Sequence, residues 1–313
     1  MPATKGMWIC GVEEAGRGPV LGPMAMAICW VKAENEHLLR EAGARDSKLL
    51  TPQRREGTLE RLDALRKEKK IGYELVLLSP KEIDAAVEGD DDNLNKLELR
   101  TSAILINTAL KKLGKERLAK ALIDCPTKNT AKYAADIKKL LKGRGAKDVE
   151  VIAEHKADVT YPVVSAASII AKVNRDKEIE RLKETINKNF GSGYPADPRT
   201  QRFLRENYGE KEYDGLFRKS WASYKNVAEA DKQRSLFHFQ IEQEKEQEKK
   251  HAAELKEFAF LEQHGFSFVP VKGPYEVLRM KGEDATVIKY TTGKLLVQGK
   301  GKARVERLLR KQS

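Results

Sequence analysis

The chain has 313 residues and a formal net charge of +12, because 59 lysines and arginines outnumber 47 aspartates and glutamates. This length allows one large domain and a smaller appendage, and a basic excess among abundant carboxylates favours a phosphate-rich partner such as nucleic acid. The three cysteines form no CxxC pair, which argues against a zinc site or a disulfide framework, and we expect neither a signal peptide nor a membrane span, hence an intracellular protein, cytoplasmic or nuclear.

Short apolar runs alternate with longer amphipathic patterns in the first part of the chain. The apolar runs are short enough for strands and occur at residues 8–12, 25–31, 73–78, 121–123 and 149–153. Apolar residues recur at helical spacing in residues 99–113, 133–141 and 162–190, and Pro162 suits the first turn of the last of these helices. The alternation predicts an α/β fold.

The composition changes beyond residue 227. Glu, Gln and Lys dominate residues 240–262, which indicates a solvated helix or a linker. Residues 286–290 and 294–298 flank a Thr-Thr-Gly turn and predict a hairpin, and a basic helix at residues 302–311 would complete a small α+β unit. We therefore divide the chain into three parts: residues 1–227, 228–264 and 265–313.

Four acidic residues stand at the ends of these predicted elements. Glu13 and Glu14 follow the first strand and precede a glycine-rich turn, Asp124 follows a later strand, and Asp158 comes just before the helix at Pro162. Carboxylates that cluster in a fold repel one another unless cations neutralise them, and oxygen ligands select Mg²⁺ or Mn²⁺. The pattern suggests a two-metal phosphodiester site, although solvated acids at element ends would give the same spacing.

Several longer motifs occur in one order along residues 8–227. They are Glu13 to Pro23, Asp46-Ser47-Lys48, Asn93-Leu94-Asn95, Asp124 after its strand, Glu154 to Lys172, Gly191 to Pro195 and Asp197 to Thr200. Together they resemble the type 2 ribonuclease H (RNase HII) family, especially its archaeal and eukaryotic catalytic subunits. The resemblance implies an RNase H-like mixed sheet flanked by helices, followed here by a small C-terminal α+β domain.

The resemblance also implies an activity. Glu13, Glu14, Asp124 and Asp158 would be the catalytic residues and the ligands of two divalent ions, Mg²⁺ or Mn²⁺. The expected enzyme is an endoribonuclease that hydrolyses the RNA strand of RNA–DNA hybrids. It would also cut on the 5′ side of single ribonucleotides embedded in DNA, and leave 3′-hydroxyl and 5′-phosphate ends.

Substrate contacts are implied at four places. The Gly16-Arg17-Gly18 turn would approach the ribose 2′-hydroxyl, and Arg17 would hold a neighbouring phosphate. Lys48 and Asn95 would touch the substrate backbone. Tyr194 would pack against the deoxyribose that follows the ribonucleotide.

One departure from the family lies at the first catalytic position, which is normally aspartate and is Glu13 here. The longer side chain leaves three outcomes open: compensation by the backbone, a preference for Mn²⁺, or a hybrid-binding protein with an impaired metal site. We favour retained activity, because the rest of the motif is complete. An RNase HIII-like enzyme that needs several consecutive ribonucleotides is a further alternative, suggested by the end of the chain.

The end of the chain adds two further resemblances. Residues 233–239, from Gln233 to Phe239, resemble the peptide that binds a sliding clamp, although a helix cap or packing would also explain them. Residues 292–300 look like part of the TBP-like substrate-binding domain of RNase HIII. A basic surface there would bind nucleic acid, and its cations are Lys289, Lys294, Lys300, Lys302, Arg304, Arg307 and Arg310.

Overall fold

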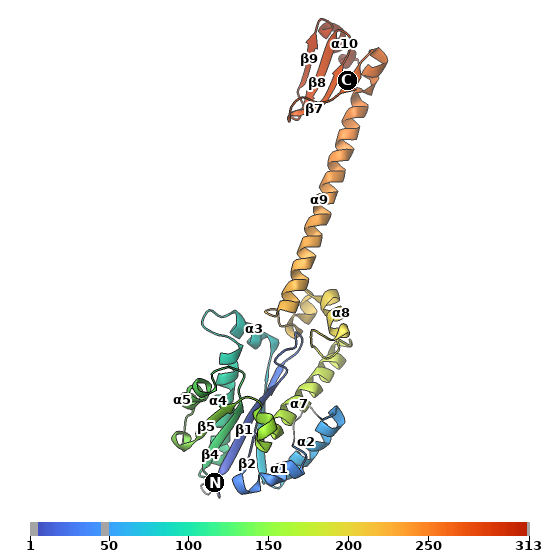
Figure 1. Cartoon of the computed structure of the whole chain (residues 1–313). Coiled ribbons are helices and arrows are strands. Elements are labelled where there is room, and N and C mark those ends of the chain that lie inside the picture. Colours follow the sequence, from blue (N-terminus) through green and yellow to red (C-terminus); the bar gives the residue numbers. More distant parts are fainter. Residues whose placement is uncertain (1–5, 45–49, 312–313) are drawn as a thin grey trace. The chain divides into compact units, whose positions relative to one another are not determined.

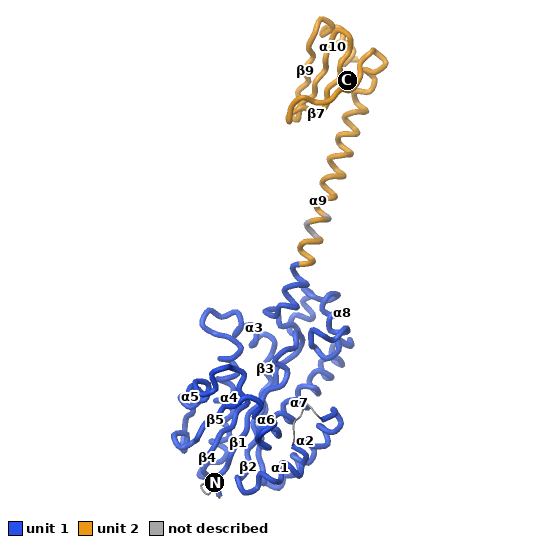
Figure 2. Tube along the Cα trace, in the orientation of Figure 1, with its two compact units in different colours: residues 1–229 blue, residues 230–313 orange. Residues whose placement is uncertain are grey.

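The computed structural model describes residues 6–44 and 50–311, apart from the side chains of Ser235, Leu236 and His238. The chain forms two compact units, one ending at Glu229 and the other beginning at Ala230 (Figure 2). None of the described helices is long and apolar enough to cross a membrane.

A five-stranded mixed sheet forms the centre of the first unit (Figure 1). Its strands, in spatial order, are β3 (Ile71–Leu78), β2 (Met24–Lys32), β1 (Trp8–Ala15), β4 (Leu118–Asp124) and β5 (Glu150–Glu154). Strand β2 is antiparallel to both β3 and β1, whereas β1, β4 and β5 are parallel. Parallel neighbours need crossover helices, which explains the alternation of strand and helix patterns in the sequence.

Helices cover both faces of this sheet. Those that contribute buried residues to the core on one face are α3 (Pro80–Glu88), α4 (Leu94–Leu113) and α5 (Thr130–Leu140). Those on the other face are α1 (His37–Glu41), α2 (Pro52–Lys67), α6 (Ala157–Thr160) and α7 (Pro162–Ile186). The predicted α/β class with a mixed, helix-flanked sheet is confirmed.

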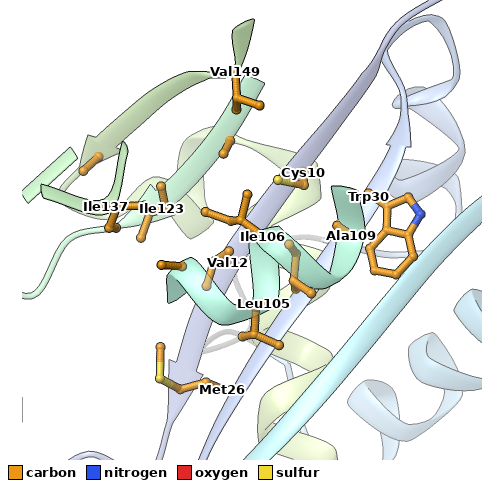
Figure 3. Packing of buried hydrophobic residues seen from close by; sticks show 14 of the residues in the cluster. Cys10, Val12, Met26, Trp30, Leu105, Ile106, Ala109, Ile123, Ile137 and Val149 are labelled. Atoms are coloured by element: carbon orange, nitrogen blue, oxygen red, sulfur yellow. The ribbon is translucent and has the colours of Figure 1, made fainter. Parts of the chain in front are cut away.

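Strand β1 separates the two cores. Cys10 and Val12 pack into the core on the α4 side, which Figure 3 shows, whereas Ile9 packs into the core on the α7 side. Gly11 faces α7 so closely that a Cβ atom there would lie 2.4 Å from the backbone nitrogen of Val164. The glycine therefore lets α7 lie directly on the central strand.

Several element boundaries differ from the sequence-based expectation. Strand β1 continues to Ala15 instead of ending at residue 12, because it keeps pairing with β2 up to the Ala15–Ala25 pair. Asp124 is the last residue of β4, and Asp158 lies inside the short helix α6. Helix α7 ends at Ile186 instead of residue 190, where Asn187 adopts a left-handed conformation with φ of 50°.

A third core lies around the C-terminal part of α7, which contributes Ile179. It gathers residues from the segment after β1, from α8 (Pro198–Asn207) and from the 3-10 segment Lys211–Leu216. Val20 and Leu21 pack there with Phe190, Phe203 and Phe217. An isolated β-bridge also pairs Leu21 with Phe217. This core fastens the glycine-rich segment that follows β1 to residues almost two hundred positions away.

The second unit is a small α+β fold, as predicted. It contains most of helix α9 (Ala222–Phe258), so residues 240–258 are helical. A four-stranded antiparallel sheet follows, made of β6 (Ser267–Val269), β7 (Glu276–Lys281), β8 (Ala285–Tyr290) and β9 (Leu295–Gly299). Helix α10 (Lys302–Arg310) packs Val305 against this sheet, in a core with Phe258. The predicted hairpin is the β8–β9 pair.

Candidate active site

Glu13 and Glu14 lie near the end of the central strand β1. Neighbouring residues of a strand point to opposite faces of the sheet, so the two carboxylates lie on different sides. Glu13 follows Gly11 on the face that α7 covers, and only 6% of it is exposed. Glu14 follows Val12 on the face that α4 covers and is half-buried.

Asp124 and Asp158 reach the same end of the sheet. Strand β4 runs parallel to β1 with Ile123 beside Val12, which places Asp124 next to Glu13 along the sheet edge. The backbone N–H of Ala157 donates to Oδ1 of Asp124 over 3.0 Å, and this bond fastens helix α6 to the end of β4. Asp158, the next residue, is 1% exposed. The structure thus brings all four predicted acids to one region.

The pKa values of the acids on β1 reflect this crowding. Burial raises the pKa of Glu13 well above its usual range, and the nearby charges of Glu14, Asp124 and Asp158 raise it further. Burial also raises the pKa of Glu14 to about 7, an effect that the positive charge of Arg17 partly opposes. Full ionisation of the four carboxyl groups at neutral pH therefore requires a compensating cation.

The donor set fits a hard divalent ion. The four side chains are all carboxylates, and carboxylate oxygens are the ligands that Mg²⁺ and Mn²⁺ prefer. Oε2 of Glu13 is buried and has no hydrogen-bond partner among the described residues, as expected of an oxygen that a cation would satisfy. Among the described residues, no three His, Cys, Asp or Glu side chains are already arranged to hold a metal ion.

Arg17 extends from the glycine-rich turn toward helix α4. Its guanidinium group forms an ion pair with Glu98, which is 1% exposed, and Nη2 donates to Oδ1 of Asn95 over 2.7 Å. Burial and the charge of Glu14 raise the pKa of Glu98 to about 8, and Arg17 opposes this shift. Asn95, predicted to contact substrate, holds Arg17 here through its position in the first turn of α4.

Tyr194 lies beside Gly18, the exposed residue of the turn. A Cβ atom on Gly18 would be 3.7 Å from Cε1 of Tyr194, and the tyrosine is 43% exposed. The guanidinium group of Arg175 lies 5.3 Å from the centre of the Tyr194 ring. Tyr194 also borders a cleft of about 570 Å³. The turn and Tyr194 therefore form a continuous surface, whereas Lys48 falls outside the described residues.

Sequence reasoning assigned no role to several residues that shape this region. Lys172 on α7 lowers the pKa of both Glu13 and Glu14, and Glu98 orients Arg17. Buried Arg175 and Arg218 lie behind the turn. Lys172 ends the motif Glu154 to Lys172, whereas no local pattern marks the other three, because each acts on a segment distant in sequence.

The cations of the second unit fall into two groups. Lys289 is paired with Glu254 and Glu257, Lys302 with Glu306, and Arg304 with Asp284. The remaining predicted cations are exposed and form no ion pair with a described residue; they are Lys294, Lys300, Arg307 and Arg310. The second group leaves a positive surface available to phosphates.

Two aromatic side chains of α9 are exposed. Phe237 is 63% exposed and Phe239 is 59% exposed, in the segment predicted to bind a sliding clamp. Packing within the described residues does not cover these rings, which weakens the alternative of a core role for them.

Comparisons with known proteins match the first unit. The family model for Ribonuclease HII matches residues 10–224. A Ribonuclease HII from Pyrococcus horikoshii is 37% identical over 231 residues, which is 74% of this chain and 97% of that protein. The crystal structure of the ribonuclease H2 from Pyrococcus horikoshii OT3 superposes with a TM-score of 0.60 and 38% identity, over 72% of this chain and 98% of that one. The PCNA:RNase HII complex from Archaeoglobus fulgidus gives a TM-score of 0.57 and 34% identity, over 70% and 96%.

Proposed function

The chain belongs to the ribonuclease HII family and is a ribonuclease H acting on RNA–DNA hybrids, and on this premise we propose how it selects and cuts its substrate. It hydrolyses the RNA strand with two divalent ions and also cuts on the 5′ side of single ribonucleotides embedded in DNA. The products carry 3′-hydroxyl and 5′-phosphate ends. The observation that supports this proposal most is the proximity of Glu14, Asp124 and Asp158 to Glu13, whose buried Oε2 atom has no hydrogen-bond partner among the described residues.

The four carboxylates would hold two divalent ions, Mg²⁺ or Mn²⁺. When bound, such ions activate water and stabilise charge on the leaving oxygen of a phosphodiester. The protein's own contribution is to keep the ligands in place: Ala157 fixes Asp124, and the sheet register fixes Glu13 beside it. Lys172 offsets part of the negative charge from the α7 side.

The Gly16-Arg17-Gly18 turn would recognise the ribonucleotide. Gly18 is exposed and lacks a side chain, so a ribose can approach the backbone there. Arg17, 35% exposed, would hold a neighbouring phosphate while Glu98 orients its guanidinium group. Tyr194 would pack on the adjoining deoxyribose, and Lys48 and Asn95 would contact the substrate backbone.

Two other functions remain as rivals. A hybrid-binding protein with a metal site impaired by Glu13 would bind the hybrid without cutting it. An RNase HIII-like enzyme would require several consecutive ribonucleotides. The proximity of Gly18 and Tyr194 favours recognition of a single ribonucleotide over the second rival.

The remainder of the chain would increase affinity for nucleic acid. We assign residues 1–227 to catalysis, 228–264 to a charged helical connection and 265–313 to binding of the duplex. The unpaired cations of the second unit would neutralise phosphates and release counterions. This assignment resembles the role implied for the TBP-like domain of RNase HIII.

The exposed aromatic residues of α9 would bind a sliding clamp through residues Gln233 to Phe239. A clamp complex of a similar family member supports this partner. Equal clamp affinity of the unchanged chain and a variant with Phe237→Ala and Phe239→Ala would refute it.

One cleavage assay tests the proposed function. The chain is incubated at enzyme excess with Mg²⁺ or Mn²⁺ and a DNA duplex that carries one ribonucleotide, or with a continuous RNA–DNA hybrid. We expect both substrates to be cut, the first on the 5′ side of its ribonucleotide. Cleavage of the continuous hybrid alone would favour the RNase HIII-like alternative, and binding without cleavage would favour the hybrid-binding alternative.

A further inference from the structure

A fully buried arginine lies directly behind the Gly16-Arg17-Gly18 turn. The side chain of Arg218 donates to the carbonyl oxygen of Gly16 over 2.7 Å, of Arg17 over 2.9 Å and of Gly22 over 3.0 Å. Its backbone N–H donates to the carbonyl oxygen of Val20 over 2.9 Å. One residue therefore contacts the segment from Gly16 to Gly22 at four carbonyl groups.

Trp221 continues this contact to the end of the turn. Its Nε1–H donates to the carbonyl oxygen of Gly18 over 3.2 Å, and the guanidinium group of Arg218 lies 5.0 Å from the centre of its ring. The intervening residues are fixed by Asp84 of α3, whose carboxylate accepts the backbone N–H groups of Lys219 and Ser220 over 2.8 and 3.0 Å. The segment 218–221 is thus attached to the body of the first unit.

The hydrogen bonds to the carbonyl groups determine where the N–H groups of the turn point. In a trans peptide the C=O group and the N–H group of the next residue point in opposite directions, and no cis bond occurs among the described residues. Because the carbonyl groups of Gly16 and Arg17 point toward Arg218, the N–H groups of Arg17 and Gly18 point away from it. These are the backbone donors beside the exposed face of Gly18.

The same cluster includes the loop that carries Tyr194. The backbone N–H groups of Val20 and Leu21 donate to the carbonyl oxygen of Gly193 over 2.9 and 3.2 Å. Arg175, itself buried, donates to the carbonyl oxygens of Pro23 and Ser192, both over 3.3 Å. The spacing between the turn and Tyr194 is therefore set by buried hydrogen bonds.

Burial of the Arg218 guanidinium group is energetically unfavourable. Removal from water and the nearby charge of Arg175 lower the pKa of Arg218 to about 9. The described residues offer the Arg218 guanidinium group backbone carbonyl oxygens as hydrogen-bond acceptors, and no carboxylate lies within ion-pair distance of it. A buried charge is tolerated only where hydrogen bonds satisfy it, so these contacts constrain the backbone strongly.

We propose that Arg218 and Trp221 are positioning residues for ribonucleotide recognition. Arg218 orients the N–H groups of Arg17 and Gly18 toward the 2′-hydroxyl group of the nucleotide at the cleavage site, and Trp221 fixes the Gly18–Pro19 peptide group that ends the turn. This inference rests on the proposed role of the turn. A single ribonucleotide in DNA offers one such hydroxyl group, whereas a continuous hybrid offers many and is also recognised by its shape. Loss of positioning therefore affects the single-ribonucleotide substrate more.

Trp221→Phe is the most informative variant, because it removes one donor and keeps an aromatic ring over Arg218. We expect kcat/KM on the single-ribonucleotide duplex to fall about three- to tenfold further than on the continuous hybrid, the range for one hydrogen bond. Trp8→Phe is the matched control; Trp8 donates to Glu116 at the other end of β1. Arg218→Lys keeps the charge but loses the fork of donors, and should enlarge the same difference.

The outcomes separate the inference from the proposed function. A selective loss with an unchanged thermal midpoint supports positioning, whereas an equal loss on both substrates, or none, overturns it. If the unchanged chain does not cut the single-ribonucleotide duplex, the proposed function fails on its own. The inference is then decided by binding: Trp221→Phe must reduce the preference for continuous hybrid over DNA duplex, and an unchanged preference overturns it.

Discussion

Arg17 and Glu98 form an ion pair between the exposed turn and a carboxylate that is 1% exposed in helix α4. The pair links the turn to the acidic residues of β1, because Glu98 also interacts with the charge of Glu14. The ion pair thus orients the guanidinium group of Arg17. Its partner is an acidic side chain that is buried and distant in sequence.

Glu98→Gln should weaken substrate binding more than it slows turnover. Above the raised pKa of Glu98, about 8, the neutral amide removes the charge that orients Arg17. A hydrogen bond between charged groups contributes about 1.5–3 kcal/mol, less where one partner is partly exposed. We expect KM for an RNA–DNA hybrid to rise about tenfold with a smaller change in kcat. Steady-state kinetics provide the measurement. Asp92→Asn, which removes the surface partner of Arg100, is the control. Equal KM values for the unchanged chain and both variants would refute the role of Glu98.

Metal ions should stabilise the protein more at high pH than at low pH. The pKa values of Glu13, Glu14 and Glu98 are raised in the folded chain, so each group holds its proton more tightly when folded. Their contribution to stability is complete below the unfolded value near 4.5 and is lost as the pH rises through about 7 for Glu14 and about 8 for Glu98. Bound cations favour the ionised acids, so they oppose this loss of stability for the four carboxylates that would hold the metal ions.

Thermal unfolding with and without Mg²⁺ at pH 5.5 and pH 8 measures the effect. The increase in Tm caused by Mg²⁺ should be larger at pH 8, by about 2–4 °C for each kcal/mol of additional stabilisation. Glu13→Gln combined with Asp158→Asn should abolish the difference. An increase that is the same at both pH values would contradict the linkage.

Glu13→Asp should change the choice of ion while activity persists. Glu13 is one methylene longer than the aspartate usual in the family, and Mg²⁺ requires more regular octahedral geometry than a longer carboxylate easily provides. We expect the ratio of the Mn²⁺-supported rate to the Mg²⁺-supported rate to fall in this variant. Glu60→Asp, on the exposed face of α2, controls for the shortening itself. An inactive parent that Glu13→Asp makes active would instead favour the hybrid-binding alternative.

Removal of the chain after Phe239 should weaken binding to the duplex. Fewer phosphates are then neutralised, so the dissociation constant rises and its dependence on salt becomes shallower. Replacing Lys294, Lys300, Arg307 and Arg310 by Gln should reproduce the shallower slope, by about 0.9 for each phosphate that is no longer neutralised. Lys245→Gln with Lys249→Gln on α9 is the control. If the salt titrations superimpose for all these proteins, the second unit does not neutralise phosphates of the duplex.

The sequence allowed prediction of the sheet and of the acidic residues, but not of how they are held. Regular alternation predicted the strands of the first unit. The motifs predicted a group made of Glu13, Glu14, Asp124 and Asp158, and these four lie near one another in the structure. Helices α2, α3 and α8 were missed, although Thr51, Ser79 and Asp197 each cap a helix whose first residue is proline, a recognisable start signal.

Long-range contacts account for what could not be predicted. The hydrogen bond that Asn95 accepts from Arg17 depends on how α4 packs, which no local pattern encodes. Arg218 resembles any surface cation in sequence and becomes buried only when residues 215–221 fold against the turn. Contacts of this kind depend on the tertiary structure as a whole.

The claim that the four acids hold a pair of divalent ions is tested most directly by anomalous X-ray scattering from a crystal of the chain grown with Mn²⁺ and an RNA–DNA hybrid. We expect two strong peaks, roughly 3.5–4 Å apart, bounded by Glu13, Glu14, Asp124 and Asp158 and adjoining the phosphate to be cut. A crystal that contains the bound hybrid but shows no manganese among these carboxylates would contradict the account.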